Sequence, residues 1–370
     1  MAEDFAELCA EVDTLEAGQA ADWDRAGLLP EAVLRKLAAE GLLCPEVPAD
    51  HGGRGLSSAV AGEFTAHVGS RCSSLRSVMT SQGMAAWTIA RMGSPAQRAD
   101  LLPRLVRGKL AAVAFSEPDA GSDLSAMRTR VRRDGERIEL NGQKVWTTAA
   151  RYADMVVVVG RLEDETGAAV VVPVDAPGVT VRPVPGPSGC RAAGHADVRL
   201  DSVRLPAGAM LGGGGQPLSL LCTTALSYGR LSVAWGCVGI LRACLTAATR
   251  HAATRQQFGK PLAEHQLVAG HLAELYSDEQ AASRACEHAS RCWDAGSADL
   301  VMGTVLAKYV SARAAARGAA TAVQVTGSAG ALEGHVVERA YRDAKLMEII
   351  EGSNEISKLM LARHAVATRR

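Results

Sequence analysis

The stretch RIELNGQKVWTT, residues 137–148, lies where the hydrophobic pattern of this 370-residue chain changes its period. The chain before it has helical patterns, whereas short β-branched runs separated by Gly, Pro and Asp follow it. Asn141-Gly142 supplies the left-handed backbone that a two-residue connection needs, so the stretch predicts a hairpin of strands 137–140 and 143–148. We therefore expect a β region to begin here.

Further short runs continue the β region, and helical patterns lie on both sides of it. The additional strands are predicted at 155–159, 169–174, 179–184 and 198–204. Short strands with turn residues between them are typical of a small β-barrel or sandwich. Before the region, helices are predicted at 30–40, 59–68, 82–92 and from 94 toward 105, with a Gly- and Pro-rich loop at 45–58.

Long Ala- and Leu-rich segments follow the Gly-rich stretch 211–216. They predict helices at 218–250, 264–293, 298–326 and 353–367. Long antiparallel helices joined by short loops form a bundle. The sequence therefore predicts an N-terminal α-helical domain (1–112), a central β-barrel or sandwich domain (113–208) and a C-terminal four-helix bundle (209–370).

The charge balance excludes several classes of function. Lys plus Arg and Asp plus Glu each number 40, so the formal net charge is +0. Binding to nucleic acid or to an anionic membrane would need a basic excess or patch, and the 4% of aromatic residues offer little for stacking on single strands. We expect neither kind of partner, and the composition is that of a globular enzyme.

The nine cysteines include no C-x-x-C pair, which argues against a zinc or redox motif, and no metal site is expected. Most of them lie in apolar stretches and are expected to be reduced core thiols, which indicates a cytoplasmic protein. The N-terminus has no signal-peptide pattern, and no apolar run approaches the ~20 residues that span a bilayer.

Four segments carry residues suited to chemistry. AFSEPDAGSD (114–123) ends in a tight turn whose N–H groups can point at a flavin edge or a phosphate, and KVWTTAA (144–150) offers an indole wall for a planar ring. RQQFGKPLAEHQ (255–266) contains an arginine that can hold a pyrophosphate. In RDAKLMEIIEGSNEISKLMLAR (342–363), Glu351 lies between an apolar run and Gly352, where desolvation would raise its pKa toward that of a general base. Taken singly, each segment has a structural alternative: a turn, a core tryptophan, a solvated arginine or a glutamate near a helix start.

In this order and on this architecture, the segments resemble the acyl-CoA dehydrogenase flavoprotein family. The resemblance covers roughly residues 23–363 and includes VPADHGGRGLS and QVTGSAG. It implies the same three domains, with FAD bound between them at a subunit interface of a homodimer or homotetramer. The reaction that it implies moves a hydride from the β-carbon of an acyl thioester to flavin N5, while a glutamate takes a proton.

The resemblance also assigns roles to residues of this chain. Glu351 corresponds to the catalytic base, Arg230 lies near the base and the thioester, and the backbone of Gly352 faces the thioester carbonyl. The flavin would be lined by Phe115, Ser116, Ser122, Trp146 and Thr148. The pyrophosphate and adenosine side would be held from a neighbouring subunit by Arg255, Phe258, Gln266, Gln324 and Gly327, and Ser353 and Glu355 would follow the base along the cofactor.

A narrower resemblance concerns RCSSLRSVMTSQGMAAW (71–87) and LSYGRLSVAWGCVGI (226–240). Both are similar to dehydrogenases of polyketide extender-unit pathways, which oxidise a hydroxylated three-carbon unit on an acyl carrier protein. A tiny polar acyl group would need polar residues in its pocket, and the candidates are Arg76, Ser77, Ser81 and Gln82. These side chains have the alternative of capping and solvating helices.

Three positions depart from the family pattern. Many CoA-specific members have an Asp three residues before the arginine at 230, where this chain has Ser227, and this favours phosphopantetheine on a carrier protein over free CoA. Asp119 and Glu355 stand where Gly and Gln are common. The alternative function is an ordinary short-chain acyl-CoA dehydrogenase. A flavin monooxygenase on this fold would lack the base, and a flavin-free paralogue would not keep Trp146 and Arg255. The sequence carries no sign of the electron acceptor.

Overall fold

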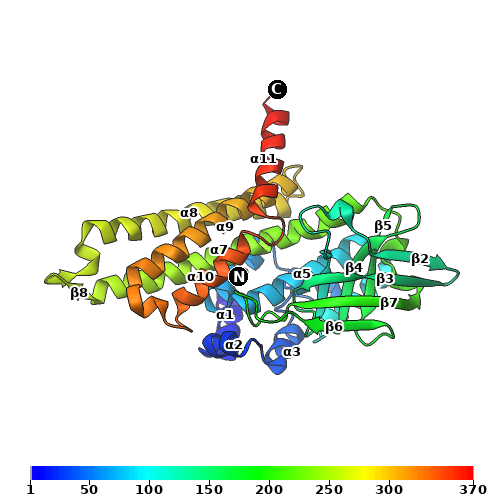
Figure 1. Ribbon diagram of the computed structural model, residues 1–370, viewed down its shortest axis with the longest axis horizontal. Coiled ribbons are helices and arrows are strands. Elements are labelled where there is room, and N and C mark those ends of the chain that lie inside the picture. Colours follow the sequence, from blue (N-terminus) through cyan, green and yellow to red (C-terminus); the bar gives the residue numbers. More distant parts are fainter. Residues whose placement is uncertain (1, 370) are drawn as a thin grey trace.

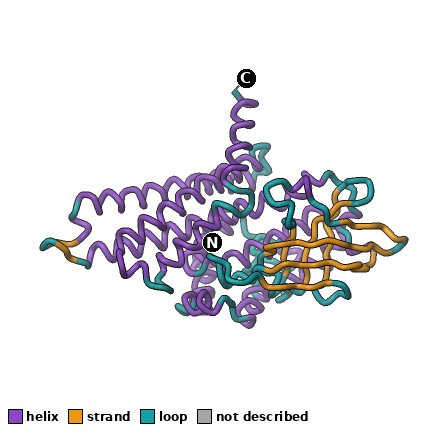
Figure 2. Tube along the Cα trace, in the orientation of Figure 1, coloured by secondary structure: helices purple, strands orange, loops and turns teal. Residues whose placement is uncertain are grey.

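The structure, a computed structural model, describes residues 2–369 and has three successive parts (Figures 1 and 2). Helices form the first part, a curled sheet the middle and long helices the last, which confirms the predicted fold class. The sheet lies at one end of an elongated body and the long helices extend to the other (Figure 1). The domain boundaries at 112 and 208 remain predictions.

The first part is a layer of six helices. They are α1 (Ala2–Glu16), α2 (Ala20–Ala26), α3 (Glu31–Ala39), α4 (Ser58–Arg71), α5 (Ser73–Met92) and α6 (Pro95–Leu105). Local sequence explains their ends: Pro30 precedes α3, Gly41 follows it with a left-handed φ of 70°, and Ser94 and Gln97 form a capping box at α6. Nearly every residue of α5 is buried, so this helix is the internal member of the layer.

The middle part is a seven-stranded sheet. Its strands are β1 (Ala111–Ala114), β2 (Arg130–Asp134), β3 (Arg137–Thr147), β4 (Met155–Arg161), β5 (Gly167–Pro173), β6 (Val179–Pro183) and β7 (Ala196–Pro206). The order is β1-β4-β2-β3-β7-β6, and β5 pairs with β4. Val157 and Val159 of β4 pack with α5 and α7 in one apolar cluster, so the bundle and the sheet share a core.

The predicted hairpin at 137–148 is wrong, because β3 runs unbroken through Asn141 and Gly142. The register between β3 and β7 shifts there, so the pair forms a bulge. Glycine is required because a Cβ at Gly142 would lie 2.4 Å from Thr129 Oγ1, and Asn141 Oδ1 accepts a hydrogen bond from the Ser202 N–H at 2.8 Å. The turn of the β2–β3 hairpin lies instead at Gly135, whose φ is 59°.

The last part contains α7 (Leu218–Thr254), α8 (Gln266–Asp294), α9 (Leu300–Thr326), α10 (Val336–Met347) and α11 (Asn354–Thr368). The sequence prediction missed α10. The two-residue strands β8 (Gln256–Gln257) and β9 (Lys260–Pro261) form a hairpin at the far end of the bundle (Figure 1). By length and composition α7 could cross a membrane, but 67% of its most apolar window is buried inside the protein, as in the central helix of a bundle.

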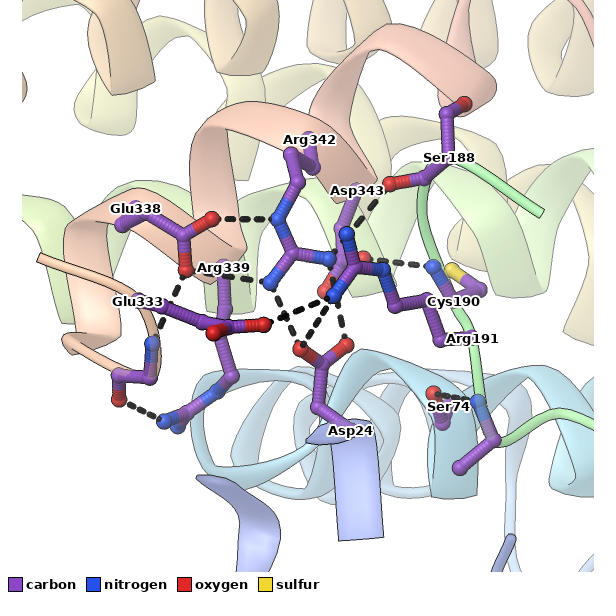
Figure 3. A network of polar contacts seen from close by, with 12 residues as sticks. Asp24, Ser74, Ser188, Cys190, Arg191, Glu333, Glu338, Arg339, Arg342 and Asp343 are labelled. Atoms are coloured by element: carbon purple, nitrogen blue, oxygen red, sulfur yellow. Dashed lines mark hydrogen bonds and ion pairs between the residues drawn. The ribbon is translucent and has the colours of Figure 1, made fainter. Parts of the chain in front are cut away.

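An ion-pair network joins the three parts around α10 (Figure 3). Arg342 of α10 donates to Asp24 of α2 at 2.6 Å and to the Ser188 carbonyl, in the loop between β6 and β7, at 3.4 Å. The next residue, Asp343, accepts from the Cys190 N–H at 2.6 Å. Because α10 leads directly into the segment that carries Glu351, this network fixes that segment relative to the sheet and the N-terminal helices.

Candidate active site

Glu351 lies in the connection between α10 and α11, and its side chain turns inward. Its Oε2 is buried without a hydrogen-bond partner, and a Cβ at Gly229 of α7 would lie 2.4 Å from that oxygen. The glycine therefore makes room for the carboxyl group. Burial raises the pKa of Glu351 to about 7, although the charges of Arg230, Lys308 and Arg76 oppose the rise. A carboxyl group that titrates near neutrality is suited to general-base work.

The backbone around Glu351 is held in an uncommon conformation. Glu351 and Gly352 both have left-handed φ values, 55° and 88°. Arg230 is 6% exposed, and its Nε donates to the Glu351 carbonyl at 3.1 Å. Ser353 caps α11 by accepting from the Ile356 N–H, which confirms the predicted helix start. The structure thus brings Glu351, Gly352 and Arg230 together.

Arg76 of α5 is a buried cation near this carboxyl group. Its side chain is 1% exposed, and it donates to Thr80 Oγ1 at 3.2 Å and to Met347 Sδ at 3.0 Å. Its Nε has no partner, and no ion pair joins it to a carboxylate within residues 2–369. A buried guanidinium group with such weak partners is costly unless a ligand completes its hydrogen bonds.

The other three candidates on α5 make contacts within the protein. Ser77 Oγ donates to the Ser73 carbonyl of its own helix at 2.8 Å, and Ser81 Oγ donates to the Thr148 carbonyl at 2.9 Å. The Gln82 side chain joins the Lys109 carbonyl to the Ala111 N–H. Only Arg76 among the four keeps a free buried donor.

The end of β3 presents an aromatic wall. Trp146 is 53% exposed, with a left-handed φ of 54° at the second irregularity of the β3–β7 pairing. Its ring lies 5.7 Å from that of His195, and His195 Nδ1 hydrogen-bonds Thr148 Oγ1 at 3.2 Å. Burial lowers the pKa of His195 to about 4, so the imidazole is neutral at pH 7, and its buried Nε2 has no partner.

A buried ion pair joins this wall to the segment after β1. Lys144 Nζ donates to Glu117 Oε1 at 2.7 Å and to the Phe115 carbonyl at 3.0 Å, and both charged side chains are buried. The Ser116 carbonyl accepts from the Val145 N–H at 2.9 Å. Phe115 and Ser116 are thereby held beside the strand that carries Trp146.

These residues fit a flat ring with a polar edge. The exposed indole offers a face for stacking, and the orphaned His195 Nε2 together with the half-buried Ser116 and Thr148 hydroxyls offers hydrogen bonds. An isoalloxazine ring has this character. Ser122 lies further out, in the exposed turn after Pro118.

The residues expected on the pyrophosphate and adenosine side gather at the opposite end of the molecule. Arg255 is the C-terminal cap of α7, and Phe258, which is 94% exposed, lies between strands β8 and β9. Gln266 begins α8 nearby. Gln324 and Gly327 lie at the end of α9, on the same side of the bundle and away from the sheet (Figure 1). Within one chain they do not meet Trp146. Glu355 is exposed and pairs with Lys358 at 3.6 Å.

Sequence reasoning missed three residues of this site. Gly229 has no role in the family resemblance, and His195 lies in a loop without a motif. Lys308 is fully buried, and its Nζ donates to the Gly352 carbonyl at 2.8 Å. The sequence does contain a signal for Lys308, because it is a single lysine among the apolar residues in this part of α9. Within residues 2–369, no group of three or more His, Cys, Asp or Glu side chains is arranged to hold a metal.

Comparison with known proteins identifies the family. Three family models match in succession: the acyl-CoA dehydrogenase N-terminal domain at 3–109, the middle domain at 112–203 and the C-terminal domain at 220–366. This chain belongs to the acyl-CoA dehydrogenase family. It is a flavin oxidoreductase that acts on acyl thioesters, and its cofactor is FAD.

Individual relatives are similar over almost the whole chain. Probable acyl-CoA dehydrogenase YngJ of Bacillus subtilis (strain 168) is 32% identical over 350 residues, which are 92% of this chain and 91% of the relative. The solved structure of FkbI, for biosynthesis of the methoxymalonyl extender unit of the polyketide immunosuppressant Fk520, is 63% identical, has a TM-score of 0.94 and covers 97% of this chain and 99% of its own. A glutaryl-CoA dehydrogenase from Mycobacterium smegmatis in complex with FADH2 is 26% identical, with a TM-score of 0.92 and coverage of 98% and 95%.

Proposed function

We propose that this enzyme oxidises a small hydroxylated acyl group carried as a thioester on acyl carrier protein, in the biosynthesis of a polyketide extender unit. The observation that carries the proposal is Arg76, a buried cation that pairs with no carboxylate within residues 2–369 and whose charge lowers the pKa of Glu351. The hydroxyl group of a hydroxylated acyl substrate would accept a hydrogen bond from the Arg76 guanidinium group, whereas a plain alkyl chain would leave that donor without a partner. The 63% identity to FkbI supports the same assignment.

The residue at position 227 supports the carrier protein over free CoA. Ser227 is 3% exposed, and its hydroxyl donates back to the Thr223 carbonyl at 2.8 Å. The carboxylate that many CoA-specific members have there is therefore missing, and the serine does not replace its charge.

The roles of the chain's own residues follow from their contacts. Glu351 accepts the proton that the substrate loses, from a position where burial keeps its pKa near 7. The N–H of Gly352 would donate to the thioester carbonyl, and Arg230 holds the backbone of Glu351 through its hydrogen bond to the Glu351 carbonyl. FAD, when bound, accepts the hydride that leaves the β-carbon. Trp146, Thr148, Phe115, Ser116 and Ser122 would hold its ring, with Ser353 and Glu355 alongside.

We infer that a second copy of the chain completes the cofactor site. The segments suited to the ring and to the pyrophosphate lie at opposite ends of one chain, so Arg255, Phe258, Gln266, Gln324 and Gly327 would serve the FAD of a neighbouring subunit in a homodimer or homotetramer. We also propose a cytoplasmic location, because all nine cysteines are free and such thiols persist in a reducing compartment.

The test is anaerobic bleaching of the flavin by a panel of four substrates. Glyceryl and propionyl groups are each loaded on carrier protein and on CoA. We expect glyceryl on carrier protein to reduce the flavin fastest, and Glu351→Gln to keep its yellow flavin but lose reduction. Arg76→Met should abolish the preference for glyceryl over propionyl.

Two outcomes would redirect the assignment. Equal or faster bleaching by propionyl-CoA would favour the alternative, an ordinary short-chain acyl-CoA dehydrogenase, which the likeness to YngJ supports. Full activity of Glu351→Gln would remove the base from its role.

A further inference from the structure

Lys308 of α9 is a buried cation whose hydrogen bonds go to the backbone around Glu351. It is 0% exposed, and its Nζ donates to the Gly352 carbonyl at 2.8 Å and to the Glu348 carbonyl at 3.4 Å. Within the described residues 2–369, no ion pair joins it to a carboxylate. A buried ammonium group without a counter-ion is costly, so this arrangement needs a physical reason.

The two carbonyls bracket the candidate base. Glu348 follows the last residue of α10, and Gly352 directly follows Glu351. Between them the chain turns through the left-handed conformation of Glu351, a backbone conformation that non-glycine residues adopt only at an energetic cost. Carbonyls at a helix C-terminus also attract a cation. Lys308 therefore contacts the turn at both of its ends.

We propose that Lys308 is a positioning residue of the active site, which holds the 348–352 turn so that the Glu351 carboxyl group points into the protein interior. The inference rests on the proposed function, in which Glu351 is the base. Lys308 touches neither substrate nor cofactor in this assignment. It acts through the backbone of Glu351 and through its charge.

The charged groups around Glu351 define what Lys308 adds. Arg76 comes from α5, Arg230 from α7 and Lys308 from α9, and all three lower the pKa of the Glu351 carboxyl group. On its own turn, the Glu348 carboxylate is engaged by Lys345 at 2.9 Å and by Asn354 at 3.0 Å. Burial lowers the pKa of Lys308 itself to about 8, so the ammonium group is still charged at the pH where Glu351 titrates. Loss of that charge should therefore raise the pKa of Glu351, while loss of its hydrogen bonds should loosen the turn.

Three variants of the holoenzyme separate these effects. Lys308→Met keeps the length of the side chain and loses both charge and donors, whereas Lys308→Gln keeps one donor. Lys345→Met is the matched control, because Lys345 contacts the same turn through the Glu348 carboxylate but is 70% exposed. Each is measured for FAD content, for anaerobic flavin reduction against pH, and for hydrogen exchange of the peptide 346–356.

For Lys308→Met we expect that FAD is retained and that flavin reduction slows by about 10–100-fold. The midpoint pH at which the rate rises should move upward, and hydrogen exchange in the 348–352 turn should be faster. Lys308→Gln should show the same upward shift of the midpoint pH with a smaller loss of rate, and Lys345→Met should match the parent. If Lys308→Met does not fold, the pH dependence of flavin reduction in Lys308→Gln provides the test.

The inference would be overturned if a folded Lys308 variant had the same rate of flavin reduction, the same pH dependence and the same hydrogen exchange as the parent. Glu351→Gln distinguishes the two failures. If that variant is inactive while the Lys308 variants are normal, only the inference fails. If Glu351→Gln reduces its flavin normally, the proposed function itself fails.

Discussion

At the scale of single residues, the buried carboxyl group of Glu351 makes the stability of the fold depend on pH. Its pKa is about 7 in the folded protein against 4.5 for an ordinary glutamate. The folded state therefore keeps this proton to a higher pH than the unfolded chain does. The stability that the group contributes is complete below about pH 4.5 and is lost as the pH rises through 7.

Glu351→Gln keeps the shape of the side chain and never ionises. We expect its free energy of unfolding to exceed that of the parent by up to about 3 kcal/mol at pH 8, and to match the parent near pH 4. Urea unfolding at the two pH values measures the difference. The exposed Glu355→Gln is the control and should change little at either pH, and an equal gain from both variants would contradict the burial argument.

At the scale of elements, α7 has a glycine where the Glu351 carboxyl group approaches it. An alanine Cβ at Gly229 would lie 2.4 Å from Glu351 Oε2, 2.6 Å from Glu351 Cδ and 2.8 Å from Met84 Sδ. These separations are far below van der Waals contact, so the carboxyl group would have to move. The helix gives up intrinsic stability at this position in order to hold the site.

Gly229→Ala should therefore slow flavin reduction by about 10²-fold or more, because the carboxyl group of the proposed base is displaced. Gly303→Ala in α9 is the matched control, since its Cβ would lie 3.6 Å from Ala289 Cα, an ordinary contact. We expect the control to keep its rate and gain about 0.5–1 kcal/mol of stability. Equal rates in both variants, from anaerobic reduction, would show that the carboxyl group does not occupy this space.

At the scale of the whole molecule, the network around Arg342 ties the N-terminal helices, the sheet and α10 together (Figure 3). The Arg342 and Asp24 side chains are only 15% and 6% exposed. Arg342→Met leaves Asp24 largely buried with fewer partners, so we expect a loss of about 2–4 kcal/mol in the free energy of unfolding.

Arg104→Met is the control for this change. It removes an i,i+4 ion pair whose side chains are 53% and 55% exposed, and such pairs contribute about 0.5 kcal/mol. Urea unfolding of both variants measures the contrast. Similar losses in the two would mean that the network adds no more than a surface pair.

In the proposed assembly, the position of Arg255 would make cofactor retention depend on a neighbouring subunit. Arg255 lies at the end of the bundle opposite the sheet, so in the proposed assembly it serves the FAD of a neighbour (Figure 1). We expect Arg255→Ala to lose flavin during gel filtration, because a phosphate-binding guanidinium group is removed. Retention equal to the parent would argue against this role, and Arg250→Ala, in the last turns of α7, is the control.

Much of this protein could be predicted from its sequence, because local signals decide local structure. The period of apolar residues indicated the long helices of the last part and most strands of the sheet, and Ser94 and Ser353 marked helix starts that the structure keeps. The segment around Glu351 indicated a base because an apolar run meets a glycine there. The burial of Glu351 and its raised pKa agree with that expectation.

Tertiary structure decided the rest. Asn141-Gly142 became a bulge because Thr129 of another segment lies against the glycine, and no local signal records that contact. Gly229, His195 and Lys308 reach the site from α7, a loop and α9, so their roles depend on packing between segments far apart in the chain. Local propensity determines elements, whereas the contacts that shift a pKa or hold a strained turn exist only once those elements are packed.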